Sequence, residues 1–326
     1  MSTAARVPET WELDGDDARE TLKRIGVRKL LRDAFKRLRF ADGFSHARSL
    51  AFATSLVLVQ GLIAIVGFAA VLNDDSIARS LVRTIRSAVP GPASRVLTDA
   101  VIQAYTTGAS SRWLPLVLGT LGALITGSTL FGQFERGLNR IYGVEQDRPS
   151  VQKYGLAFLL TLTAGACAAA AFVAFAFGRE IGTSIGSEAR TVWDIARWPI
   201  ALVLIGAAMA LLFRLSPYRR QPAWSWLAYG SALSIVLWTA STVALGVMFE
   251  VSSTFGDTYG PLAGIVALQI WTLLSAISIL YGAAVAAQLE AVRAGQPEVQ
   301  DQDKVDDVPA KPDTDKPDTD KLVSTH

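Results

Sequence analysis

The chain has 326 residues, a formal net charge of +2 and a mean hydropathy of +0.32, and 51% of its residues are hydrophobic. This composition fits a polytopic membrane protein with polar ends, and the nearly neutral net charge says little by itself. The single cysteine, Cys167, excludes an intrachain disulfide and a thiolate metal site, and is read as a small packing residue.

The first 45 residues carry two different patterns. Residues 1–20 are polar and acidic and are predicted to be disordered. Residues 21–45 are predicted to form a basic amphipathic juxtamembrane helix, because ten Lys or Arg lie between Arg19 and Arg48 around one apolar face. The apolar face comprises Val27, Leu31, Ala34, Phe35 and Leu38. This helix either binds anionic lipid headgroups or packs against the protein's own cytoplasmic loops, and the basic charge also serves as an orientation signal.

Six stretches without charge have roughly the length of a membrane-spanning helix, which needs about 20 mostly apolar residues. They are residues 49–72, 113–134, 154–177, 198–213, 227–249 and 258–289. A soluble core does not need six such runs. The sequence therefore predicts an all-α polytopic membrane protein, with a six-helix transmembrane bundle over residues 46–293 and no cleavable signal peptide.

The distribution of basic residues predicts the orientation of the spans. The segments 135–153 and 214–226 carry four and three Lys or Arg, whereas the 40-residue segment 73–112 carries five. This density bias, together with the basic N-terminal region, places both termini in the cytoplasm. The expected location is the plasma (inner) membrane, crossed several times.

The first outer loop is predicted to be a helical hairpin. Ile77, Leu81, Ile85 and Val89 recur at steps of four before Pro90-Gly91-Pro92, and a second apolar series follows from Val96 to Ala104. We expect this helical extracytoplasmic loop to lie on the outer membrane surface or to cap the bundle. Residues 294–326 hold nine acids, four lysines and a tandem Lys-Pro-Asp-Thr-Asp repeat, and are predicted to be a disordered acidic tail.

The sequence contains few candidates for catalysis. Its two histidines, His46 and His326, form no zinc-binding pattern, and no P-loop occurs. We therefore expect no catalytic, cofactor-binding or metal-binding residues, no cofactor and no enzymatic activity.

Polar residues at the ends of the spans are the better candidates for function. A cytoplasmic cluster is predicted from His46, Arg48, Gln133, Glu135, Arg136, Asn139 and Arg140. In this cluster Glu135 is expected to form a polar network with His46 and Arg48, because they share one membrane depth. Candidate outer or pathway residues are Gln60, Glu250, Asp257, Tyr259, Gln269 and Gln288. A buried amide in hydrocarbon needs a partner, so these residues either join helices or line a substrate path.

Several short motifs, taken in order, resemble the YihY/BrkB family of inner-membrane proteins, once named ribonuclease BN. They are Phe-Ser-His-Ala-Arg-Ser-Leu-Ala-Phe at 44–52, Phe-Glu-Arg-Gly-Leu-Asn-Arg-Ile-Tyr at 134–142, Pro-x-Trp at 222–224, Tyr-Gly-Pro-Leu-Ala-Gly at 259–264, Trp271 and Tyr-Gly-Ala at 281–283. The resemblance implies a six-helix membrane fold with a structured outer loop and a role in envelope integrity or virulence.

One position departs from the family pattern. The resemblance implies an acid after Gly282-Ala283, where this chain has Ala284, so a transport role of that acid is either lost here or taken by Glu290. The former ribonuclease label finds no support in a metal-binding cluster, and the basic N-terminal stretch fits lipid better than RNA, so no nucleic-acid partner is expected.

The leading hypothesis from the sequence is a non-ATP-driven transporter or facilitator of a lipid or other envelope component. The alternative is a structural or scaffolding membrane protein that recruits envelope partners. An intramembrane enzyme is disfavoured, because no pair of nucleophile and base stands out.

Overall fold

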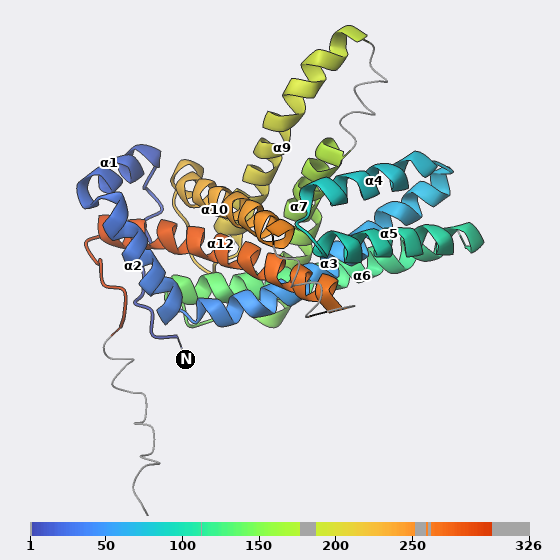
Figure 1. Cartoon of the computed structure of the whole chain (residues 1–326). Coiled ribbons are helices and arrows are strands. Elements are labelled where there is room, and N and C mark those ends of the chain that lie inside the picture. Colours follow the sequence, from blue (N-terminus) through green and yellow to red (C-terminus); the bar gives the residue numbers. More distant parts are fainter. Residues whose placement is uncertain (1, 112, 177–186, 252–258, 260–261, 302–326) are drawn as a thin grey trace, which may run out of the picture.

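The computed structural model describes residues 2–111, 113–176, 187–251, 259 and 262–301, and the regular elements in these ranges are helices (Figure 1). Their bounds are α1 Gly15–Ile25, α2 Val27–Phe40, α3 Gly43–Leu72, α4 Asp75–Ala88, α5 Ala93–Ser110, α6 Trp113–Ile141, α7 Ser150–Ala176, α9 Ser187–Leu215, α10 Trp224–Val251 and α12 Ala263–Arg293.

Six of these helices are long and apolar enough to cross a membrane, which confirms the predicted fold class. The spans are Gly43–Leu72, Trp113–Ile141, Ser150–Ala174, Ile195–Leu215, Trp224–Val251 and Ala263–Arg293. Each reaches the length that the hydrocarbon core requires, and the helices continue past the predicted charge-free runs into the polar loops. Large apolar side chains on the outer faces of the spans are exposed, among them Ile125 and Val203, as expected where lipid is the solvent.

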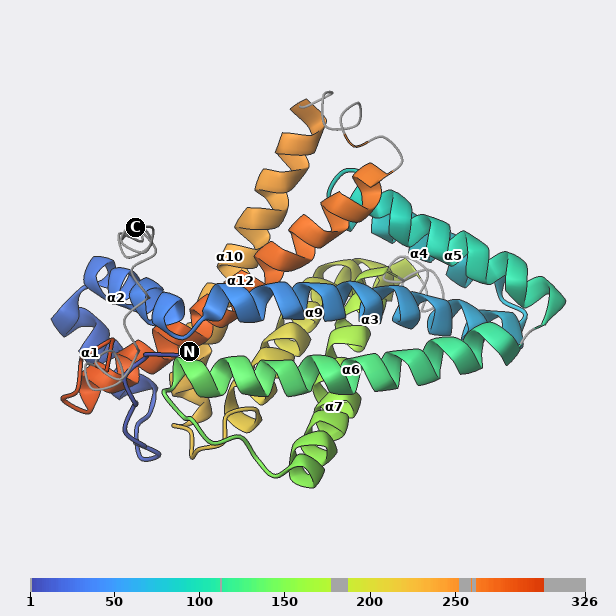
Figure 2. The same ribbon diagram turned by 90° about the horizontal axis from the view of Figure 1, so that it is seen from below.

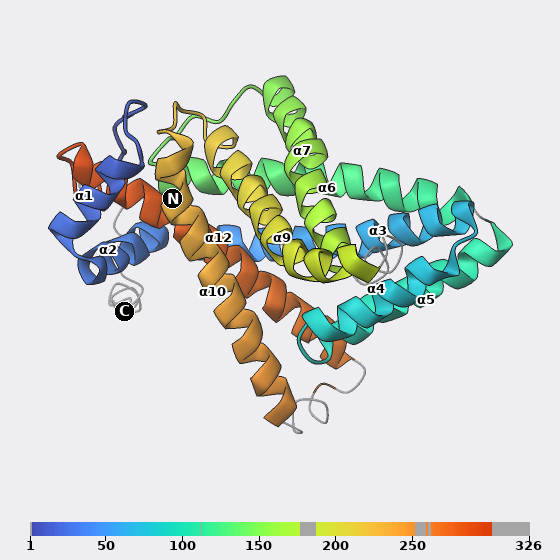
Figure 3. The ribbon, with the colours of Figure 1, turned by 90° about the horizontal axis from the view of Figure 1, so that it is seen from above.

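The spans form three neighbouring pairs, α3 with α6, α10 with α12, and α7 with α9. Because the spans alternate in direction, their ends gather in two regions (Figure 2). We name the region of α1, α2 and the segments 142–149 and 216–223 the proximal end, and the region of α4 and α5 the distal end. The pairs lie close together proximally and diverge distally, with α4 and α5 between the α3–α6 pair and the α10–α12 pair (Figures 2 and 3).

Glycines let two of these pairs pack backbone against backbone. A Cβ added to Gly119 of α6 would collide with the backbone of Ala64 in α3, and one added to Gly230 of α10 would lie 2.6 Å from the carbonyl oxygen of Gly282 in α12. Lipid gives helices no hydrophobic drive to associate, so close van der Waals contact of this kind stabilises the pairs.

The predicted helical hairpin is confirmed, and one of its faces packs against the spans. Helices α4 and α5 are joined at Gly91, whose φ of +51° suits glycine and whose backbone lies against Phe249 of α10. α5 contacts both α3 and α12, and α4 contacts α7. The apolar side chains of the hairpin therefore meet those of the spans in a distal core. Its buried members are Leu62, Val66, Ala78, Leu81, Ile85, Val89, Ala93, Leu97, Val101, Ala104, Leu245, Ala267, Leu268 and Trp271.

The proximal core forms around the last turns of α12, where every residue from 282 to 291 is buried. Its largest fully buried side chains include Trp226, Tyr142, Phe213 and Leu38. Helices α1 and α2 pack against α12, so the end of this span is enclosed by protein.

The N-terminal segment differs from its prediction as a disordered region over residues 1–20. Ala4 pairs with Gln300 in an antiparallel bridge, and the side chains of Ala4 and Val7 are buried in the proximal core. An Asp14 capping box then starts α1 at Gly15. Composition alone missed this order because the stabilising partners are distant in sequence. Residues 294–301 of the predicted disordered tail are also described, whereas 302–326 lie outside the described residues.

The predicted juxtamembrane helix over 21–45 is two helices, because Gly26 adopts a φ of +78° between α1 and α2. α2 buries Leu30, Ala34, Arg37 and Leu38, while Val27 and Phe35 of the predicted apolar face are exposed. Packing against the protein's own helices therefore uses one side of α2, and a basic surface with two exposed apolar side chains remains on the other.

Candidate functional site

The proximal end contains two clusters of polar side chains, each built around a buried carboxylate, Glu290 in one and Glu135 in the other. The Arg37–Glu290 cluster comprises Thr10, Arg37, Tyr142, Arg219, Gln288 and Glu290. The Glu135–Asp147 cluster comprises Glu135, Arg136, Asn139, Asp147, Arg148 and Lys153. The first cluster draws its members from segments far apart in the sequence, whereas the second lies within residues 135–153.

Arg37 of α2 is fully buried and connects four segments of the chain. Its Nε donates to Gln288 Oε1 at 2.7 Å, Nη1 to the carbonyls of Ala5 and Ile141 at 2.8 and 3.3 Å, and Nη2 to the carbonyl of Glu298 at 2.9 Å. Burial lowers the pKa of Arg37 to about 10, which still leaves the guanidinium protonated at neutral pH.

Arg219 and Glu290 form a buried ion pair, with side chains 1% and 0% exposed and Nη2 and Oε1 2.6 Å apart. The pair is completed by polar neighbours, because Thr10 donates its hydroxyl to Glu290 Oε1 at 2.7 Å and Arg219 donates to the carbonyl of Pro8 at 2.9 Å. These contacts hold residues 8–10 and the segment 216–223 against the end of α12.

Tyr142 lies beneath this pair, with its ring centroid 4.6 Å from the Arg219 guanidinium carbon. Burial, and then the nearby charge of Glu290, raise the pKa of Tyr142 above its ordinary value, so the phenol stays neutral. A neutral ring face under a guanidinium is a favourable cation–π arrangement when both are withdrawn from water.

In the second cluster, the 2% exposed Glu135 of α6 pairs with Arg148, whose Nη1 lies 3.2 Å from Oε1. Arg148 also donates to the backbone carbonyls of residues 215, 216 and 217, and lies 5.1 Å from the ring centroid of Tyr218. Asn139 Oδ1 accepts from the backbone N–H of Tyr218 at 2.7 Å. The loops after α6 and α9 are thereby held against each other.

Asp147 is the acceptor shared by the rest of this cluster. It receives Lys153 Nζ at 3.1 Å and Asn139 Nδ2 at 3.2 Å, and Arg136 Nε lies 3.6 Å away. Partial burial alone would raise the pKa of Asp147, but the hydrogen bonds from Lys153 and Asn139 and the nearby cations outweigh it and hold the pKa below its ordinary value.

The carboxylates of both clusters are paired with cations, although Glu135 Oε1 and Arg219 Nε make no hydrogen bond among the described residues. Such pairing positions helix ends. Among the described residues, no group of three or more His, Cys, Asp or Glu side chains could hold a metal ion. The chemistry of these clusters is therefore that of buried ion pairs, which fix geometry while costing desolvation free energy.

The structure brings Glu135, Arg136 and Asn139 of the predicted cytoplasmic cluster together, but with different partners. The ion-pair partner of Glu135 is Arg148, not His46 or Arg48 as expected. Arg48 is exposed on the first turns of α3. A shared depth along the membrane normal did not identify the partner, because the side chains of α3 and α6 point in different directions around their axes.

The other members of that prediction lie at the edge of the cluster. His46 is half-buried where α3 meets α6, 3.4 Å from the Cβ position of Gly137. Arg140 donates to the carbonyl of Glu145 at 3.2 Å, and Gln133 is half-buried.

The predicted outer or pathway residues fall in three places. Gln288 lies near the proximal end of α12 and belongs to the Arg37–Glu290 cluster. Glu250 and Tyr259 lie near the distal ends of α10 and α12 and are exposed, and Asp257 lies outside the described residues.

Gln60 and Gln269 lie within the spans. Gln269 Nε2 donates to Ser55 Oγ at 2.9 Å and so joins α12 to α3. The Gln60 side chain faces α6 beside Gly122, and its Oε1 is buried without a hydrogen-bond partner among the described residues. Gln60 is thus an intramembrane polar group whose hydrogen bonding is incomplete.

Sequence reasoning missed Arg37, Arg148, Arg219 and Glu290 as site residues. The sequence pattern groups Arg37 with the lipid-facing basic residues of its helix, although its spacing from Leu30, Ala34 and Leu38 puts it on their face. Glu290, considered only as a substitute for the acid missing at Ala284, is the single acid of the last span and could have been matched to a loop arginine.

One serine-hydrolase pattern, Gly-x-Ser-x-Gly, occurs at residues 182–186, outside the described residues. In hydrolases of that type the serine lies on a turn between a strand and a helix. Here the described elements on either side, α7 and α9, are both helices.

Comparison with known proteins gives relatives of moderate identity. The chain is 24% identical over 268 residues to YfkH of Bacillus subtilis (strain 168), which is named only as a provisional ribonuclease-like protein, with 79% of this chain and 94% of that protein covered. It is 28% identical over 249 residues to a UPF0761 membrane protein of Azoarcus sp. (strain BH72), covering 75% of this chain and 59% of the relative.

A UPF0761 membrane protein of Rhodospirillum centenum (strain ATCC 51521 / SW) is 28% identical over 290 residues, with 87% of this chain and 64% of the relative covered. The match thus spans about six-tenths of the length of these two UPF0761 relatives. No solved structure matches the chain. Residues 34–307 match the family described as virulence factor BrkB, which covers every span and both proximal clusters except Thr10. The chain belongs to the virulence factor BrkB family of membrane proteins.

Proposed function

We propose that this protein is a non-ATP-driven transporter or facilitator that moves a lipid or another envelope component across the plasma (inner) membrane and so supports envelope integrity. The observation that carries the proposal is Gln60, whose Oε1 is buried in mid-span without a partner among the described residues. Leaving a buried acceptor unsatisfied costs about 1–3 kcal/mol. Such a group persists where another state, water or a substrate completes its hydrogen bonds.

The arrangement of the spans supports the same proposal. Proximally the helices are held by buried ion pairs, whereas distally the α4–α5 hairpin lies between spans that diverge. A hairpin that separates the α3–α6 pair from the α10–α12 pair can admit an amphiphile if it moves, because its contacts there are mainly apolar.

Flux of fluorescent phospholipids in proteoliposomes tests the proposal. We expect the purified protein to accelerate transbilayer movement above that in protein-free vesicles. Gln60→Leu should lower the rate while keeping thermal stability, since it removes an unsatisfied acceptor and keeps the side-chain volume. Gln269→Leu, which breaks the bond to Ser55, is the matched control for losing an intramembrane amide. No flux with the native protein would overturn the proposal.

The second candidate is a scaffold that recruits envelope partners. The observation that favours it is the proximal end, which is filled by buried side chains and carries an exposed basic face on α2 with Val27 and Phe35. Absence of flux combined with specific capture of an envelope protein by the native chain, and loss of capture by Phe35→Ser, would favour the scaffold over the transporter.

The proposal includes cytoplasmic termini, contact of the basic face of α2 with anionic lipid headgroups, and no enzymatic activity. Alkaline phosphatase should be inactive when fused after Val292 and active when fused within the hairpin.

Binding of the full chain to anionic vesicles should weaken in high salt. Degradation of RNA by the purified protein would contradict the proposed absence of enzymatic activity. Hydrolase activity of the native protein that is lost in Ser184→Ala would contradict it as well.

A further inference from the structure

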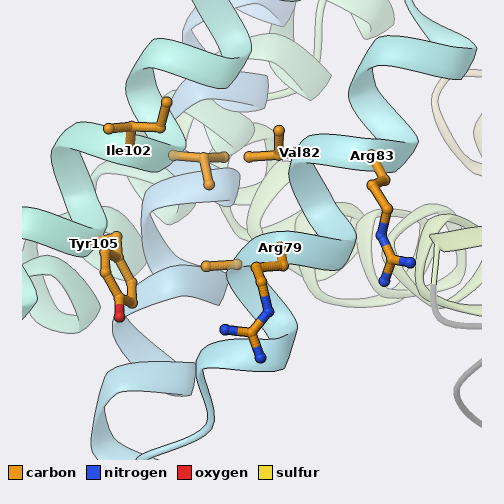
Figure 4. A pocket seen from close by; sticks show the side chains of 7 residues that line it. Arg79, Val82, Arg83, Ile102 and Tyr105 are labelled. Carbon is orange, nitrogen blue, oxygen red and sulfur yellow. The ribbon is translucent and has the colours of Figure 1, made fainter.

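The α4–α5 hairpin carries a groove of about 650 Å³ on its surface (Figure 4). It is lined by Ala78, Arg79, Val82 and Arg83 of α4 and by Val101, Ile102 and Tyr105 of α5. This volume lies within the range of about 300–1,000 Å³ that is typical of small-molecule sites.

The polar and apolar groups of the groove are segregated. The guanidinium groups of Arg79 and Arg83 and the hydroxyl of Tyr105 point to one side, whereas Val82 and Ile102 lie toward the other (Figure 4). Arg79 and Arg83 are four residues apart on one helix, which puts both on the same face. A ligand that fits this pattern has an anionic head and an apolar chain.

Both arginines have polar neighbours among the described residues. Arg83 Nη2 donates to Ser80 Oγ at 2.9 Å. The fully exposed Asp74 lies near Arg79, and its pKa is held below the ordinary value by hydrogen bonds from Ser76 and, to a lesser degree, by Arg79. Two guanidinium groups line this rim, and a planar guanidinium suits a pair of phosphate oxygens.

The place of the groove in the fold indicates where such a ligand comes from. α4 begins three residues after α3 ends at Leu72, so the groove lies at the distal end of a membrane span. Ile102 and Tyr105 are 50% and 41% exposed, although they belong to a helix that packs against two spans. Because a span ends where the hydrocarbon core gives way to the headgroup region, we expect a groove at the end of a span to be accessible to membrane lipids.

We propose that this groove binds an anionic membrane phospholipid, with its phosphate on Arg79 and Arg83 and an acyl chain along Val82 and Ile102. The proposal deepens the proposed function, on which it rests, by naming the class of envelope component. Binding and flux are measured separately. Lipid binding without flux would therefore overturn the proposed transport function and would leave the proposal of a lipid site intact.

The experiment measures binding of radiolabelled phosphatidylglycerol to the full-length protein in neutral detergent micelles. The double variant Arg79→Gln/Arg83→Gln should bind at least about tenfold more weakly, because it removes two charge-assisted contacts to the phosphate. The matched control is Arg86→Gln/Arg95→Gln, which removes two exposed arginines of the same hairpin outside the groove and should stay within about twofold. Equal losses in both double variants would overturn the site as non-specific charge attraction.

Two further measurements separate the contribution of the lipid headgroup from that of the acyl chain. Unlabelled phosphatidylcholine with the same acyl chains should compete poorly, and inorganic phosphate should compete only at far higher concentration. Ile102→Asn should weaken lipid binding without changing the melting temperature, because its side chain is half-exposed. Competition by phosphate at the concentration of the lipid, or unchanged binding by Ile102→Asn, would overturn the proposal of a lipid site.

Discussion

The proximal and distal ends of this protein are held together in different ways. At the proximal end, buried charged groups connect residues that are far apart in the sequence, such as Arg219 with Glu290 and Arg37 with Gln288. At the distal end, apolar side chains of α4 and α5 pack among α3, α10 and α12. Ion pairs and hydrogen bonds are directional and fix one arrangement, whereas apolar contact is non-directional and tolerates sliding. The comparison indicates a rigid proximal end and an adaptable distal one.

The largest effect is expected from breaking the buried pair at the proximal end. Glu290→Leu leaves the Arg219 guanidinium buried without its carboxylate and should lower the free energy of unfolding by about 3–5 kcal/mol. Thermal unfolding in detergent measures this. The double variant Arg219→Met/Glu290→Leu removes both charges and should recover part of the loss. A double variant as unstable as the single one would contradict an unpaired charge as the cause.

A smaller effect is expected in the Glu135–Asp147 cluster. Glu135→Ala leaves Arg148 without its carboxylate and should cost about 2–3 kcal/mol, less than the first pair because Arg148 keeps its bonds to three backbone carbonyls. Glu145→Ala, at an exposed position of the same loop, should stay within about 0.5 kcal/mol. Equal stability, expression and envelope-stress phenotypes of the two variants would show that the buried pair is unimportant.

Hydrogen exchange compares the two ends directly. Backbone amides of α4 and α5 should exchange at least about tenfold faster than those of residues 282–291 in α12, because local opening of the hairpin breaks mainly apolar contacts. Exchange measured by mass spectrometry on the native protein in detergent tests this. Equal protection of the hairpin and α12 would contradict an adaptable distal end.

The smallest effect is the pH dependence contributed by Asp147. Its pKa is lower in the folded protein than in the unfolded chain, so its stabilisation is complete above the unfolded value of about 3.9 and is lost as the pH falls through the folded value. Asp147→Asn should therefore lower the melting temperature at neutral pH and flatten its acid dependence near about pH 3–4. If the melting temperature of Asp147→Asn depended on acid pH as that of the native protein does, other carboxylates would be responsible for this dependence.

Local sequence signals predicted the elements of the fold well. The six spans and the α4–α5 hairpin follow from apolar runs and from steps of four residues broken at Pro90-Gly91-Pro92, because lipid requires long uninterrupted helices. The order of residues 2–14 could not be predicted in the same way. Their composition is that of a disordered segment, and what orders them is contact with α2, the loop after α6 and the segment 297–301.

The sequence by itself determined that this chain has six helices able to cross a membrane and carries an amphipathic hairpin between its first two spans. Only the tertiary structure decided the partners, pairing Glu135 with Arg148 and Glu290 with Arg219, and turning Arg37 inward on a helix whose other basic residues lie outside the core. The physical reason is the sequence distance over which each kind of interaction acts. Hydrophobic periodicity is a property of a few neighbouring residues, so it can be recognised in the sequence. The partner of a buried charge depends instead on how helices are rotated and how closely they approach in the folded protein.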